Sequence, residues 1–136
     1  IQDYALVRNY EDVRAAVANG FPVIFCSTVG FNPSCKDCNP GGRDSNGFLK
    51  ACGRWAHAMC GIGVHDKGKN PGVLIQNSWG ANWVRGPKRL GQPDGSFWVR
   101  PETIDKMCSM GDSYAISGYK GFPSKQLDYH VFRPWR

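Results

Sequence analysis

A histidine and an asparagine near the middle of the sequence are the side chains best suited to catalysis. His57 stands at the start of an apolar segment of small residues, and Asn77 follows the next apolar segment, in Asn77-Ser78-Trp79-Gly80. If both segments are antiparallel strands, the start of the first lies beside the end of the second. The Asn77 oxygen could then accept the His57 N–H and fix the tautomer, which leaves the other ring nitrogen free to take a proton from a nucleophile.

The surroundings of this pair decide between a catalytic and a structural interpretation. Trp79 stands next to the expected hydrogen bond, where it could exclude water and strengthen it. A histidine on a strand of small residues is, by itself, more often structural. We interpret the other two histidines, His65 and His130, as surface residues, because the sequence offers neither a partner.

The elements that must position the pair are predicted from apolar periodicity and capping residues. Asn9 suits the N-cap and Gly20 the C-terminal end of a helix over 10–19. Gly and Pro make residues 30–53 and 84–95 loops. Strands are predicted over 22–27, 56–64, 72–76, 96–100 and 114–118, with a short helix from Pro101 to about residue 110. One helix followed by strands and long loops indicates an α+β fold with an antiparallel sheet.

Six cysteines form two groups. Cys26, Cys60 and Cys108 stand in apolar segments and are predicted to be small core residues, whereas Cys35, Cys38 and Cys52 stand in the long loop. The loop cysteines could form one disulfide, which would favour an oxidising compartment, or they could remain free thiols. A third alternative is a zinc site, which needs one more ligand such as His57 or His65.

Length and composition narrow the class of protein. The chain has 136 residues, enough for a single domain, and 41% apolar against 21% charged residues excludes a disordered chain. No apolar run is long enough to span a membrane. The net charge of +6 is spread along the sequence without a basic stripe, so we do not expect a nucleic-acid partner. We expect no cofactor and no resident metal as the first interpretation.

The ordered motifs resemble the C-terminal half of the papain-like cysteine peptidases, the family of papain and the cathepsins. The resemblance covers about residues 9–118: a helix, a strand, a variable loop, a His57-Ala58 strand, and a strand that runs into Asn77-Ser78-Trp79-Gly80. Trp83 looks like the second Trp of this family, and the segment 95–99 looks like its next strand. Residues 84–94 look like an insertion.

This resemblance implies a fold and a set of roles. His57 would be the general base and acid, Asn77 its orienting partner, and Trp79 the shield of their hydrogen bond, with Ser78 and Trp83 in support. The implied fold is the antiparallel β-barrel-like lobe of a two-lobed enzyme, with the active site in the cleft between lobes. Residues 1–118 would form this lobe, and residues 119–136 an aromatic and basic C-terminal extension suited to docking on a partner.

The half that carries the nucleophilic Cys in this family has no counterpart in these residues. We therefore expect an N-terminal papain-like lobe, as a separate chain or as upstream sequence, and peptide or protein substrates. The start at Ile1 suggests a processed chain or one piece of a longer protein. We expect none of the six cysteines to serve as the nucleophile, and this chain alone to be inactive.

Two alternatives to the peptidase remain open. The chain could be an inactive papain-like module that serves a structural or binding role in a larger assembly such as a virion. It could also be a zinc-dependent hydrolase that uses Cys35, Cys38, Cys52 and a histidine. The possible disulfide and assembly role favour a secreted or virion-associated protein, and the segment 73–104 gives an impression of a bacterial or phage relative.

Overall fold

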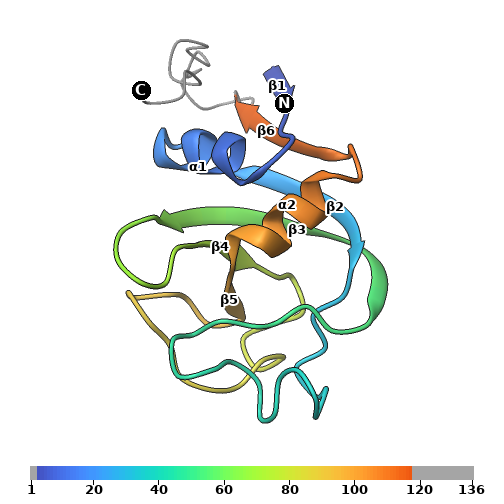
Figure 1. Cartoon of the computed structure of the whole chain (residues 1–136), viewed down its shortest axis with the longest axis vertical. Coiled ribbons are helices and arrows are strands. Elements are labelled where there is room, and N and C mark those ends of the chain that lie inside the picture. Colours follow the sequence, from blue (N-terminus) through green and yellow to red (C-terminus); the bar gives the residue numbers. More distant parts are fainter. Residues whose placement is uncertain (1–2, 118–136) are drawn as a thin grey trace.

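A computed structural model describes residues 3–117, and the C-terminal extension predicted over 119–136 lies outside them. The described chain has six strands and two helices (Figure 1). In chain order they are β1 (Asp3–Leu6), α1 (Tyr10–Ala18), β2 (Val23–Val29), β3 (Arg54–His65), β4 (Gly72–Gln76), β5 (Ser96–Val99), α2 (Pro101–Cys108) and β6 (Ser113–Ser117). The strands form one sheet in the order β1-β6-β2-β3-β4-β5, and every paired neighbour is antiparallel. The predicted α+β class with an antiparallel sheet is confirmed.

Local sequence explains the ends of both helices. The Asn9 side chain accepts the backbone N–H of Asp12, as an N-cap should, and α1 ends at Ala18 before Gly20 takes a positive φ of 82°. Pro101 opens α2, where its missing N–H costs no hydrogen bond. α2 ends at Cys108, two residues before the end predicted for it, because the chain turns there toward β6.

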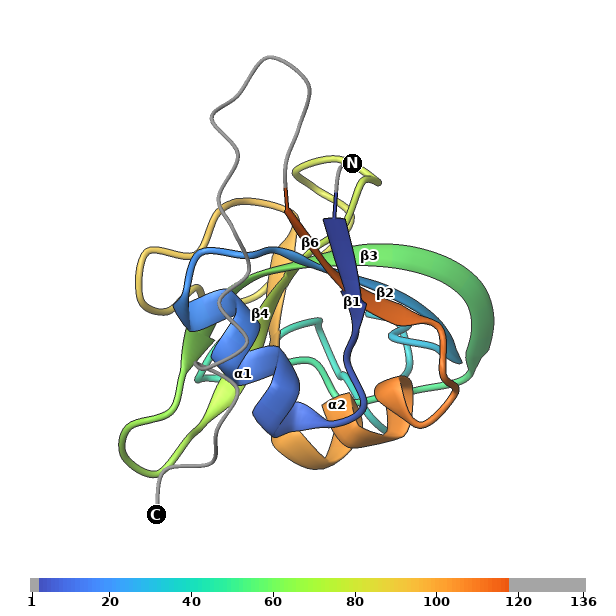
Figure 2. The ribbon, with the colours of Figure 1, turned by 90° about the horizontal axis from the view of Figure 1, so that it is seen from above.

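Both helices cover the same side of the sheet (Figure 2). In β2, alternate residues are buried beneath them, and Phe25 shares this buried face with its β3 partner Met59. The opposite side carries a row of paired residues that runs from Leu6 through Tyr114 and Ile24 to Cys60. That side is only partly covered, and Leu6 is 39% exposed.

The sheet differs from the predicted pattern at one edge. β1 was not expected, since a segment of only four residues is too short to show the alternation that predicts a strand. It forms because β6 offers its outer edge, so that Tyr4 and Leu6 pair with Ile116 and Tyr114. The sheet therefore has two edge strands, β1 and β5, and is open.

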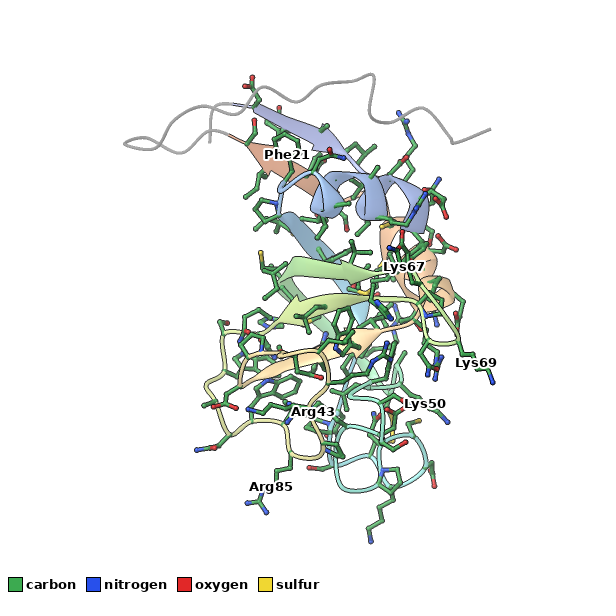
Figure 3. The ribbon with its side chains drawn as sticks, turned by 90° about the vertical axis from the view of Figure 1, so that its left-hand side faces the viewer. Phe21, Arg43, Lys50, Lys67, Lys69 and Arg85 are labelled. Atoms are coloured by element: carbon green, nitrogen blue, oxygen red, sulfur yellow. A yellow bond between two sulfur atoms is a disulfide. The ribbon has the colours of Figure 1, made fainter. Side chains whose placement is uncertain are left out.

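The predicted loops over 30–53 and 84–95 lie together at the end of the molecule away from β1 (Figure 1). Arg43, on the first loop, is 8% exposed and donates side-chain hydrogen bonds to the carbonyls of Gly86, Pro87 and Ser96 (Figure 3). The backbones touch at Gly42, where a Cβ would overlap the Arg85 carbonyl. One buried guanidinium thus fastens the two loops to each other.

No helix among residues 3–117 has the length and apolar character needed to cross a lipid bilayer.

Candidate active site

The sheet register brings His57 and Asn77 together. β3 pairs with β4 so that Cys60 lies opposite Gln76, the last residue of β4. Asn77 therefore leaves β4 beside the first half of β3, where His57 pairs across the other edge with Ser27 of β2. The His57 Nε2 and the Asn77 Oδ1 lie 2.8 Å apart, within hydrogen-bond distance.

A second hydrogen bond fixes which end of the Asn77 amide faces the histidine. The backbone N–H of Ser78 donates to Asn77 Oδ1 at 2.7 Å, and of the two ends of the Asn77 amide only the oxygen can accept a hydrogen bond. Because Oδ1 can only accept, the bond to His57 requires a proton on Nε2. In the neutral ring Nδ1 is then unprotonated and is the atom able to act as a base.

Tryptophan side chains enclose the imidazole. Trp79 stacks on His57 with ring centroids 4.4 Å apart and an interplanar angle of 24°, while Trp55 meets the same ring edge-on at 5.8 Å. Trp55 also contacts Trp79 edge-on at 4.9 Å. These rings keep water from one face of the imidazole and lower the local dielectric around its hydrogen bond to Asn77. Trp79 itself is 49% exposed, so its outer side faces solvent.

Trp83 and Ser78, the other two residues predicted to support the site, contribute in different ways. Trp83 donates its indole N–H to the Gly95 carbonyl at 2.8 Å and packs between Trp79 and the buried Phe97. It therefore connects the site to the core. Ser78 contributes its backbone N–H, while its side chain is on an exposed residue.

Trp55 is the site residue that the sequence did not single out. The pairing of β2 with β3 shifts register between Ser27 and Val29, so the strand is irregular where Trp55 enters it. Simple alternation could not predict its direction through such an irregularity. The one available signal was an aromatic residue two positions before His57. Its indole Nε1 is buried without a hydrogen-bond partner among the described residues.

The three loop cysteines also come together. Cys35 and Cys52 form a disulfide, and the Sγ of Cys38 belongs to the same cluster, in which all three sulfur atoms lie within 4.8 Å of one another. The zinc alternative needed one more ligand, such as His57 or His65. Neither histidine is part of this cluster, and His57 instead bonds to Asn77, so neither supplies a fourth ligand in this structure.

The remaining cysteines occupy positions unsuited to a reactive thiolate. Burial raises the pKa of the Cys108 thiol to about 12, and burial also raises the pKa values of Cys60 and, with a contribution from Asp112, of Cys26. Cys26 and Cys60 are half-buried rather than core residues, because they lie on the side of the sheet that the helices leave open. Raised pKa values disfavour the thiolate form that a nucleophile requires.

The aromatic residues Phe97 and Trp98 and the histidine His65 lie outside the His57–Asn77 pair. Phe97 and Trp98 are both buried. His65 was predicted to be a surface residue without a partner, but it is half-buried and meets Trp98 edge-on at 6.4 Å. His130 lies outside the described residues.

Comparison with known proteins found no match, either among the models of protein families or among the curated proteins.

Proposed function

We propose that this chain is the His/Asn half of a papain-like cysteine peptidase, which hydrolyses peptide bonds together with an N-terminal half that supplies the nucleophilic Cys. The observation that carries the proposal is the hydrogen bond of 2.8 Å between His57 Nε2 and Asn77 Oδ1. It holds the ring in the tautomer that leaves Nδ1 basic, beside a stacked Trp79.

The proposed chemistry assigns each side chain a step. His57 Nδ1 takes the proton of the incoming thiol, and the thiolate attacks the peptide carbonyl. The imidazolium then returns the proton to the leaving amine, and an acyl-enzyme thioester forms. Water, activated by the same Nδ1, hydrolyses the thioester and restores the thiol. Asn77 stays hydrogen-bonded to Nε2 throughout and keeps Nδ1 aimed at the reacting atoms.

The exposed side of Trp79 supports a missing partner lobe beside the histidine. His57 lies on the same side of the sheet as its strand neighbour Met59, so Leu6 and the open side of the sheet face away from it. Trp79 stacks on His57 and is 49% exposed, which leaves an aromatic surface next to the imidazole for a partner to cover. In the proposed enzyme this chain is the β-barrel-like lobe, and the Cys-bearing lobe packs on the Trp79 side and brings its thiol to His57.

The same geometry would also be found in a papain-like module that has lost activity and serves an assembly. The exposed Tyr4, Ile62 and Trp79 favour a partner in that case too. The two functions differ in one respect. Only the enzyme needs a thiol brought within proton-transfer distance of His57 Nδ1.

The test begins with the polypeptides that copurify with this chain from its native source, identified by intact mass. The enzyme predicts a partner with a Cys at a helix start, and predicts that the complex labels with an electrophilic thiol-directed inhibitor while this chain alone does not. In the complex, His57→Ala should lower the labelling rate by about 100-fold or more, because a general base contributes roughly 10²–10⁴-fold.

His65→Ala is the matched control, since His65 lies on the same strand and outside the site. It should leave the labelling rate unchanged. A complex that never labels, or one in which His57→Ala labels as fast as the parent protein, would refute the peptidase and leave the inactive module.

A further inference from the structure

Three sulfur atoms of the first long loop form a cluster that the proposed peptidase does not use. The Sγ atoms of Cys35, Cys38 and Cys52 all lie within 4.8 Å of one another, and each residue is half-buried. Two of them are joined in the Cys35–Cys52 disulfide, and Cys38 is a free thiol beside it. A third sulfur beside a disulfide is more than a loop cross-link requires.

The backbone around the cluster is held by hydrogen bonds that do not depend on the disulfide. Asn39, which is 3% exposed, donates from Nδ2 to the carbonyls of Lys50 and Asn32 and accepts the Lys50 N–H at Oδ1. The N–H of Asn39 also donates to the Cys35 carbonyl at 2.8 Å, which closes a turn around Cys38. Asn39 thereby fixes the two arms of the loop against each other.

Cys52, on the other side of the cluster, is held by its backbone. The Cys52 N–H donates to the Gly30 carbonyl at 2.8 Å, and the Gly30 N–H donates to the Gly53 carbonyl at 3.1 Å, beside an isolated parallel bridge between Phe31 and Cys52. Gly30 has no room for a side chain, since a Cβ would lie 2.7 Å from the Cys52 carbonyl oxygen. Reduction of the disulfide therefore leaves the three sulfurs close together.

We propose that the reduced chain binds one thiophilic metal ion, of the class of Zn²⁺, through the thiolates of Cys35, Cys38 and Cys52. Zinc binds thiolates at about 2.3 Å, which in tetrahedral geometry places the sulfurs about 3.8 Å apart. The cluster needs only small side-chain movements to reach that spacing. Thiolates select soft ions over Mg²⁺ or Ca²⁺, and water completes the fourth position.

Metal and disulfide are alternative states of the same site, because a sulfur in a disulfide has no thiolate to offer. A phosphine reductant breaks the S–S bond, supplies two electrons, and becomes the phosphine oxide with oxygen from water, while both sulfurs gain protons. Binding of the ion then displaces three thiol protons to solvent. Both the disulfide and the metal ion would join the loop to Cys52, two residues before β3 begins. The start of the strand that carries His57 would thus be held in place under oxidising and under reducing conditions.

The test is metal titration of the full chain, reduced with a phosphine under anaerobic conditions. Co²⁺ should give one equivalent of visible absorption typical of tetrahedral thiolate coordination, and one equivalent of Zn²⁺ should displace it. The oxidised chain should take up neither ion stoichiometrically. If reduction unfolds the metal-free chain, one equivalent of Zn²⁺ should restore its circular dichroism spectrum.

Single substitutions separate this site from chance binding. Cys38→Ser keeps the disulfide and should weaken Zn²⁺ binding to the reduced chain by at least about tenfold, since loss of even an outer-shell partner commonly costs 10–100-fold. Cys26→Ser, a half-buried thiol on β2, should not change the affinity. Parent-like binding by Cys38→Ser, binding by the oxidised chain, or failure of Zn²⁺ to bind or to restore the fold would overturn the proposal. No step of this test depends on peptidase activity, so the two proposals can fail separately.

Discussion

Arg43 provides the sharpest test of how the two long loops beside the site are held together. Its guanidinium donates four hydrogen bonds to three carbonyls, those of Gly86, Pro87 and Ser96, at distances from 2.8 to 3.3 Å. No acidic side chain forms an ion pair with it among the described residues, and burial lowers its pKa. Arg43→Met keeps the apolar stem of the side chain and removes all four hydrogen bonds.

The size of the effect follows from the carbonyls left behind. Ser96 O keeps a second donor, Gln92 Nε2 at 3.3 Å, whereas the carbonyls of Gly86 and Pro87 accept from Arg43 alone within residues 3–117. Gly86 and Pro87 are exposed residues, so water can take the place of the guanidinium at their carbonyls. Each of the four hydrogen bonds lost contributes about 0.5–1.5 kcal/mol, which gives about 2–6 kcal/mol in total, and relief of the buried charge offsets part of this. We expect the free energy of unfolding to fall by about 2–4 kcal/mol.

Urea unfolding followed by tryptophan fluorescence measures this change. Arg85→Met is the matched control, because Arg85 lies on the partner loop and its side chain points out of the molecule (Figure 3). It should change the free energy of unfolding by no more than about 0.5 kcal/mol. A result for Arg43→Met within that same 0.5 kcal/mol would show that the buried guanidinium does not hold the loops together.

Two further predictions concern the site and a buried thiol. Asn77→Ala should remove the preference of the His57 ring for the tautomer with the proton on Nε2. Loss of one hydrogen bond of about 0.5–1.5 kcal/mol changes the ratio of the two tautomers by roughly 2- to 12-fold. The nitrogen NMR shifts of His57 measure this ratio, with His65 as internal reference, and an unchanged ratio would refute the assigned orientation of the Asn77 amide. Cys108, with its pKa raised to about 12, should have about one thiol in ten thousand ionised at pH 8 and should resist alkylation that modifies Cys38. Equal alkylation rates for Cys108 and Cys38 would contradict this expected resistance. The folded-state pKa of Cys108 lies above the ordinary value of 9.0, so its contribution to stability is complete below pH 9 and is lost as the pH rises toward 12.

Much of the fold could be predicted because its signals are local. The cap at Asn9, the positive φ at Gly20 and the Pro101 start each satisfy a backbone requirement that can be read from neighbouring residues. β1 could not be predicted in this way. It exists only because β6, more than a hundred residues later, presents an unpaired edge.

The candidate site, too, has contacts that the sequence could predict and contacts that it could not. The meeting of His57 with Asn77 follows from strand order, because the end of β4 must lie beside the start of β3. The contact of Trp55 with the imidazole follows from an irregular register between β2 and β3, which no spacing in the sequence specifies. The pairing of Cys35 with Cys52, and the place of Cys38 beside them, likewise depend on the path of a loop without periodicity.

The orientation of the histidine depends on a chain of contacts that ends in Arg43. Asn77 is held because Ser78 donates to the same oxygen that faces His57, so the backbone beyond β4 must keep its path. That backbone continues into Trp83, whose indole is tied to Gly95, and Gly95 precedes Ser96, whose carbonyl accepts from Arg43. A buried charge in one loop therefore limits the freedom of a hydrogen bond in the other. The loops over 30–53 and 84–95 therefore brace the segment after β4, and it is this segment that holds the histidine in one tautomer through Asn77.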